Sequence, residues 1–221
     1  MSERIEERVS QAQIQTFASC TQATFPAVLK RYQHTLKLLG CEDQQVLSWI
    51  TDIAWPTTDD DAFGDIYAAP VLLAPQDTPT IECSGIEISL YTQPAIPSLE
   101  ELPSWIGFNL LIESEQLQED IPAPYSREAG ESIWRILQVL AQNFTEVGAY
   151  FTNEWQENQV WRTIAEKAGD PWVFDLGIFP RKLAAHFEMV PAGFKGTVTD
   201  AGFGFAQLNR WQQLPWDKVE A

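Results

Sequence analysis

The distribution of proline constrains the fold of this chain more than any other feature of its sequence. Most of its fourteen prolines lie between residues 56 and 124. Proline lacks the backbone donor of a helix and clashes with the preceding turn, so long helices are excluded there. Such a stretch is typical of turns and edge strands. We expect strands at residues 66–73, 80–91 and 108–113, with a turn or bulge at Ser84-Gly85.

Helical periodicity is expected on both sides of this middle section. Before it, apolar spacing predicts three helices, and the first would place Ile5, Val9, Ala12 and Phe17 on one face. The three are expected near residues 2–17, 24–40 and 42–54. After the middle section, the same reasoning predicts helices at 128–144 and 156–167, strands at 147–151 and 172–179, and a strand or hairpin at 196–208. Residues 181–189 fit a helix or a strand equally well.

These elements together predict a single α+β domain over residues 1–221. It would consist of a helical N-terminal unit over about residues 1–55, a proline-rich and largely antiparallel sheet, and further helices packed on one face. With 45% hydrophobic and 12% aromatic residues, the chain has enough apolar surface to bury a sizeable core. The chain is also rich in tryptophan, and we expect Trp211 and Trp216 to dock the C-terminus onto the domain.

The negative charge of the chain, −17 in total, is concentrated in the same middle section. Between Lys37 and Arg127 there is no lysine or arginine, although this stretch contains many aspartates and glutamates. Such a surface repels phosphate backbones and anionic lipid, so direct binding to nucleic acid or membranes is disfavoured. It would attract cations or a basic protein partner. The simpler alternative is a solvated face that keeps the protein in solution.

The sequence predicts a cytoplasmic protein. The N-terminal residues are charged and polar, without the apolar stretch of a secretory signal, and no run of about 18 apolar residues occurs. The three cysteines, Cys20, Cys41 and Cys83, are too widely spaced to suggest a metal motif or a disulfide framework. We expect them to be reduced and buried as small apolar side chains.

One local cluster of carboxylates, Asp59, Asp60, Asp61 and Asp65, is a candidate for binding. When it is compared with the calcium loop of an EF-hand, Asp59 and Asp61 match ligand positions. Phe63 and Pro70, however, occupy positions that require oxygen ligands. Aspartate and glycine are also common in solvated turns. The sequence therefore predicts no metal site here.

Catalytic signatures are scarce. There is no P-loop, no Gly-x-Ser-x-Gly and no His-Glu-x-x-His, and we expect no cofactor. Acid, base and imidazole groups occur together only around residues 181–188. Arg181, His186 and Glu188, together with Asp175, are therefore the candidate catalytic residues. A surface histidine among ordinary charges is the competing interpretation.

Two classes of function follow from these observations. The first is a non-enzymatic protein-binding module, of the kind found in inhibitors, immunity proteins and adaptors, which would hold a basic partner on the acidic section. The alternative is an enzyme, such as a hydrolase or isomerase, whose carboxylate and histidine site has no linear motif. An acidic mimic of nucleic acid is less favoured because several of the acids lie in turn-like segments. The sequence predicts no oligomeric state.

Overall fold

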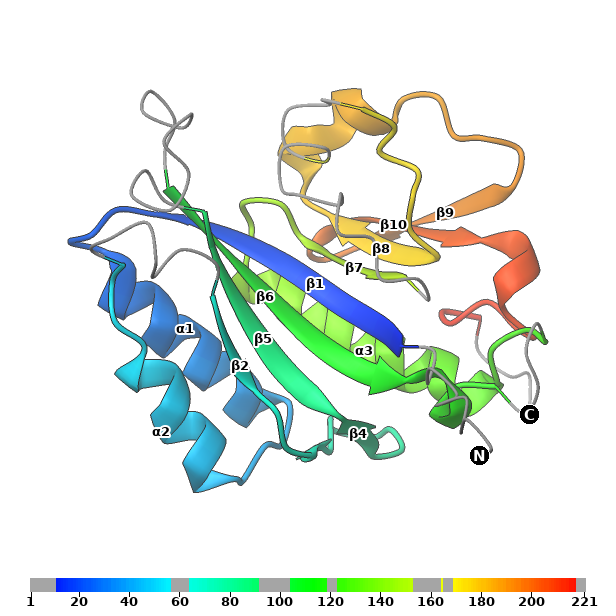
Figure 1. Cartoon of the computed structure of the whole chain (residues 1–221). Helices are drawn as coiled ribbons and strands as arrows, with labels where there is room; N and C mark the ends of the chain where they lie inside the picture. The colour runs from blue at the N-terminus through cyan, green and yellow to red at the C-terminus, as the bar shows by residue number, and fades with distance from the viewer. Residues whose placement is uncertain are drawn as a thin grey trace, which may run out of the picture.

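The computed structural model describes residues 11–56, 64–91, 104–118, 123–152, 164 and 169–217. It has a mixed α+β fold built on an antiparallel sheet of eight strands (Figure 1). The strand order across this sheet is β2-β5-β6-β1-β7-β8-β10-β9. These strands are β1 Gln11–Cys20, β2 Asp65–Tyr67, β5 Gly85–Tyr91, β6 Ser104–Glu113, β7 Ala149–Thr152, β8 Leu176–Phe179, β9 Phe194–Thr199 and β10 Gly202–Gln207. The predicted fold class is therefore confirmed.

A separate pair of short strands, β3 Val71–Leu73 and β4 Ile81–Cys83, forms a second sheet beside the main one. The expected continuous strand at 66–73 is therefore wrong, because the chain breaks at residues 68–70 and its two halves join different sheets. The interruption expected at Ser84-Gly85 is confirmed. At this point the chain leaves β4 and enters β5 of the main sheet.

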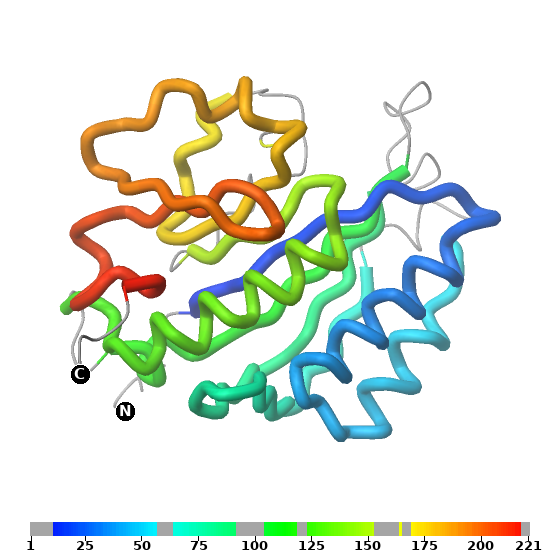
Figure 2. Tube along the Cα trace, turned by 180° about the vertical axis from the view of Figure 1, so that it is seen from behind, coloured from blue at the N-terminus to red at the C-terminus, as the bar shows by residue number. Residues whose placement is uncertain are grey.

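Three α-helices pack on one face of the main sheet, as Figure 2 shows from behind. They are α1 Phe25–Leu38, α2 Gln44–Asp52 and α3 Arg127–Asn143. All three agree closely with the predicted helices because their start and stop signals are local. Ser126 caps α3 by accepting a hydrogen bond from the Ala129 amide at 3.1 Å. Gly40 follows α1 with a φ of 77°, a conformation that favours glycine.

The predicted first helix is wrong over its described part, because Gln11–Cys20 forms β1. This strand pairs along its whole length with β6 and over four residues with β7. Every side chain from Ala12 to Ala18 is buried, so both faces of the strand are covered. A strand buried on both faces loses the alternation that would distinguish it from a helix. Residues 2–10 lie outside the described part.

An aromatic cluster covers the opposite face of the sheet, around strands β8 and β10. Phe174, Phe179 and Phe187 pack there with Phe205 and Trp172. The segment that was ambiguous in the sequence forms a 3-10 helix, η4 Arg181–Phe187, and contributes Phe187 to this cluster. The predicted hairpin is confirmed as β9–β10. The predicted helix at 156–167 lies outside the described residues, apart from Ile164, which is helical and buried.

The C-terminal segment docks onto α3 as expected. The indole of Trp211 is buried against Tyr125, with ring centroids 4.7 Å apart. Trp216 packs on Trp134 of α3 at 5.1 Å. Gly130 of α3 makes this approach possible, since an added Cβ would lie 3.3 Å from the Trp211 ring. The tail therefore closes one side of the helical layer.

Candidate functional site

The strand order places the base-free part of the sequence at one end of the sheet. β2, β5 and β6 are consecutive at that end, and α2 lies beside β2 through the Trp49–Tyr67 ring contact (Figure 1). We call the described part of residues 38–126 the acidic end. Its carboxylates are exposed or partly exposed, and none forms an ion pair with another described residue. They belong to Glu42, Asp43, Asp52, Asp65, Asp77, Glu82, Glu87, Glu113 and Glu115.

The other end of the sheet has a different charge. β8, β10 and β9 and their connections carry Arg181, Lys182, Lys195 and Arg210. Only Arg210 of these four is ion-paired among the described residues, to Asp175. Asp170, Asp175, Glu188 and Asp200 lie in the same part of the chain, so this end is close to neutral. The acidic end is strongly negative by comparison, and a basic partner would prefer it.

The acidic end contains a pocket of about 490 Å³ between the α1–α2 connection and β3. Glu42 and Asp43 contribute carboxylates to its wall, and Leu72 contributes an apolar surface that is 58% exposed. Glu82 lies directly opposite Leu72 in the β3–β4 pair, so its side chain leaves the same face of that small sheet. An exposed apolar side chain beside acidic residues is suited to the stem and charged head of a lysine or arginine.

The floor of this pocket depends on a close approach between two backbone segments. The Ala74 amide donates to the Leu39 carbonyl at 2.9 Å, which ties the end of β3 to the end of α1. A Cβ on Gly40 would lie 2.4 Å from the Ala74 carbonyl oxygen, so only glycine fits there without displacement. The pocket is thus part of the rigid frame and not of a loose surface loop.

Asp43 and Asp65, at the acidic end, both accept hydrogen bonds from α2. Asp43 caps α2, where its Oδ1 accepts from the Gln45 amide at 2.8 Å. Asp65 accepts from the Trp49 indole at 3.1 Å. Desolvation and the negative charge of Asp43 raise the pKa of Tyr67 above its usual value.

Of the predicted binding cluster, only Asp65 belongs to the described residues. It lies on β2 with an exposed side chain and bonds to Trp49 as above. Asp59, Asp60 and Asp61 lie outside the described part. Among the described residues, no group of three or more His, Cys, Asp or Glu side chains is placed to hold a metal ion.

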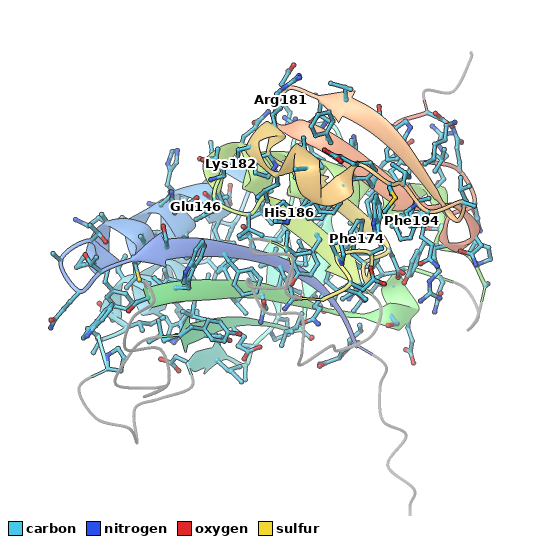
Figure 3. The ribbon with its side chains drawn as sticks, turned by 90° about the horizontal axis from the view of Figure 1, so that it is seen from above. Glu146, Phe174, Arg181, Lys182, His186 and Phe194 are labelled. Carbon is cyan, nitrogen blue, oxygen red and sulfur yellow. The ribbon has the colours of Figure 1, made fainter. Side chains whose placement is uncertain are left out.

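The four candidate catalytic residues lie at the two ends of β8. Asp175 precedes this strand and is buried, where its carboxylate accepts from the Tyr125 hydroxyl at 2.8 Å and from Arg210 Nε at 3.1 Å. Arg181 and His186 follow the strand on η4, and Glu188 comes next (Figure 3). The four-residue strand between them spans about 13 Å. The structure therefore brings Arg181, His186 and Glu188 into one segment but places Asp175 elsewhere.

The candidate residues on and after η4 differ in their exposure and contacts. Arg181 and Glu188 are exposed, and Arg181 lies 5.8 Å from the centre of the Phe203 ring. The Nδ1 atom of His186 is buried and has no hydrogen-bond partner within the described part of the chain. A general base is normally oriented by a second group that accepts its other N–H.

A polar network on the sheet face opposite the helices was missed by sequence reasoning. Ser89 and Asn109 donate to the two carboxylate oxygens of Glu87 at 3.1 and 3.0 Å, and Gln15 donates to Asn109 at 3.0 Å. Because a carboxylate only accepts, Asn109 must turn its NH2 group towards Glu87 and its oxygen towards Gln15. Gln15 then donates to that oxygen. Its sequence signals are alternating polar residues, Gln11, Gln13 and Gln15 on β1 and Glu87 and Ser89 on β5.

All three cysteines are free and buried, as expected. Burial raises the pKa of the Cys20 thiol to about 11 and also raises those of Cys41 and Cys83. A raised pKa keeps the thiol protonated, and the protonated form is a poor nucleophile and metal ligand.

We therefore expect these thiols to be unreactive in the native protein. At pH 8, their reaction with a disulfide reagent should be at least about 100-fold slower than in urea, since both burial and protonation oppose it. A time course of thiol release with and without denaturant measures this. One fast native thiol would identify a reactive cysteine and contradict the prediction.

Raising the pH from 9 towards 11 should lower the free energy of unfolding, because the Cys20 thiol loses its proton in the unfolded chain at a lower pH than in the folded protein.

No family model, curated protein or solved structure matches this chain. No helix in the described part is both long and apolar enough to cross a membrane.

Proposed function

We propose that this chain is a non-enzymatic protein-binding module that holds a basic protein partner at its acidic end. The observation that carries the proposal is the pocket lined by exposed Leu72 together with Glu42 and Asp43, with Glu82 opposite Leu72 on the paired strand. A solvated acidic face needs carboxylates only, and it gains nothing from an exposed leucine. Exposed apolar groups rimmed by charge are typical of surfaces that contact a partner.

The charge of this end would act mainly on association. Carboxylates without counter-ions attract a basic partner over about a Debye length, roughly 10 Å at 0.1 M salt, and orient it before contact. Burial of Leu72 and of the stems of basic side chains would then stabilise the complex. Binding should consequently be fast, salt-sensitive and selective for basic proteins.

The enzymatic alternative has less support in the geometry. It would require Asp175 to act together with Arg181, His186 and Glu188, from which β8 separates it. Asp175 is also already bonded to Tyr125 and Arg210. The binding proposal needs no rearrangement of described residues.

The proposal is tested by reversing charge at the pocket. In the double variant Glu42→Lys with Glu82→Lys, capture of basic proteins from nuclease-treated lysate at about 50 mM salt should fall at least about tenfold. Quantitative mass spectrometry of the bound fraction measures this loss. At about 500 mM salt, the wild-type protein should lose the same partners.

The matched control is Glu128→Lys with Glu188→Lys, which changes the net charge equally but lies outside the acidic end. It should retain the partners of the wild-type protein. Equal losses in both variants would mean that only total charge matters. Unchanged capture by the pocket variant would refute the proposed function.

A further inference from the structure

A second hollow of the surface lies away from the acidic end, between α3, the β9–β10 hairpin and the C-terminal tail. It has a volume of about 750 Å³, enough for a small organic ligand. In Figure 2 the tail lies beside the first turns of α3 and the hairpin lies beside the same helix. Arg127, Glu131, Trp134 and Gln138 form the wall on α3, at the three- and four-residue spacing of one helix face. We call this hollow the tail groove.

Two indoles give the tail groove an aromatic surface. Trp134 and Trp216 pack with centroids 5.1 Å apart and planes at 55°. Trp134 is held against the sheet because Gly204 leaves room for it, since a Cβ there would lie 2.4 Å from the indole. Trp216 remains partly exposed, and Val198 on the facing strand is 64% exposed. The groove therefore offers aromatic and aliphatic contact that water covers in the free protein.

The charge of the tail groove is not balanced. Arg127 is engaged by Glu131, with Nε 2.8 Å from the carboxylate oxygen. Asp200, in the hairpin turn, and Asp217, in the tail, also line the groove and form no ion pair with another described residue. Lys182 and Lys195, in the same half of the molecule, do not line it. The groove thus presents the carboxylates of Asp200 and Asp217 beside its indoles.

We propose that the tail groove binds an aliphatic organic cation, a polyamine-type ligand whose methylenes lie on Trp216 and Val198 and whose ammonium groups meet Asp200 and Asp217. Ammonium groups are attracted to the face of an indole and to carboxylates, and the two features occur together here. An anion would be repelled, and a neutral saccharide would leave both aspartates without a counter-charge. This site is independent of the proposed function at the acidic end.

The groove is tested with spermidine as the probe and the indole N–H signals of a ¹H–¹⁵N spectrum as the readout. Spermidine should shift the signals of Trp216 and Trp134, assigned through single tryptophan-to-phenylalanine variants. Trp49 bonds to Asp65 at the acidic end, so its signal reports separately on that surface. Shifts confined to Trp49 would overturn the groove proposal and leave the proposed function unaffected.

Substitutions then test which carboxylates bind spermidine. Asp200→Asn with Asp217→Asn should weaken spermidine binding at least about tenfold by calorimetry. Glu128→Gln with Glu188→Gln, outside both the groove and the acidic end, should change it less than about twofold. Trp216→Phe should retain most of the affinity and Trp216→Ala should lose at least about threefold. Equal loss in both carboxylate pairs, or equally tight binding of a neutral trisaccharide, would refute the proposal.

Discussion

Replacing Tyr32 with alanine should lower the free energy of unfolding by about 3–5 kcal/mol, the usual range for removing a large buried aromatic side chain. Tyr32 is fully buried on α1 and stacks on Phe108 of β6 and on Phe144 after α3, with centroids 4.6 and 4.3 Å apart. One ring therefore joins the sheet to two helices. Its removal would leave a cavity that none of the three elements can close alone.

Tyr32→Phe separates the ring from its hydroxyl. The hydroxyl donates to the Ile106 carbonyl at 3.1 Å, so its loss should cost only about 1 kcal/mol. Urea unfolding followed by circular dichroism gives both values. If alanine and phenylalanine were equally destabilising, the hydrogen bond would carry the effect and the packing argument would be wrong. Exposed His34, on the same helix, is the control, and His34→Ala should change stability by less than about 0.5 kcal/mol.

The elements predicted well from the sequence are those whose signals are local. α1, α2 and α3 each show an apolar stripe together with a recognisable start or stop, such as Ser126 before α3 and Gly40 after α1. β1 shows no such signal, because its burial arises from pairing with β6, more than eighty residues away, and with β7 still further along the chain. Long-range pairing leaves no periodic trace when both faces of a strand are covered.

The candidate site was predictable in its charge but not in its shape. The absence of bases between Lys37 and Arg127 is evident from the sequence. The shape depends on the strand register that places Glu82 opposite Leu72 and on the close approach of Gly40 to Ala74. Neither can be read from the sequence. The tail groove could not be predicted from the sequence either, because α3, β9 and the C-terminal tail meet only in the folded chain.

The tail groove and the acidic end also differ in what supports them. The acidic end is formed by α2, β2 and the β3–β4 pair, which are anchored to the sheet. The tail groove exists only while residues 211–217 remain docked on α3. Any change that releases the tail should therefore abolish the groove while leaving the acidic pocket intact. Asp175 contacts the start of this tail through Arg210 and the Trp211 indole.

Replacing Asp175 with alanine should destabilise the protein by about 2–4 kcal/mol. Its carboxylate accepts from the Tyr125 hydroxyl and pairs with Arg210, and its carbonyl accepts from the Trp211 indole at 3.2 Å. Removal of the carboxylate leaves a buried hydroxyl and a cation without this partner. The expected cost lies below that of a fully buried pair because about a third of the Arg210 side chain is exposed.

Asp175→Asn is the sharper variant, since it keeps the shape and removes the charge. If Asp175 anchors the tail, this variant should lose at least about 1 kcal/mol in urea unfolding, and amides of residues 208–217 should exchange faster with deuterium. Asp200→Asn, at an exposed aspartate that forms no ion pair with another described residue, should do neither. An Asp175→Asn protein with wild-type stability and tail protection would contradict the anchoring role. Asp175 would then be a buried carboxylate without a stabilising role, which would favour a chemical role for it.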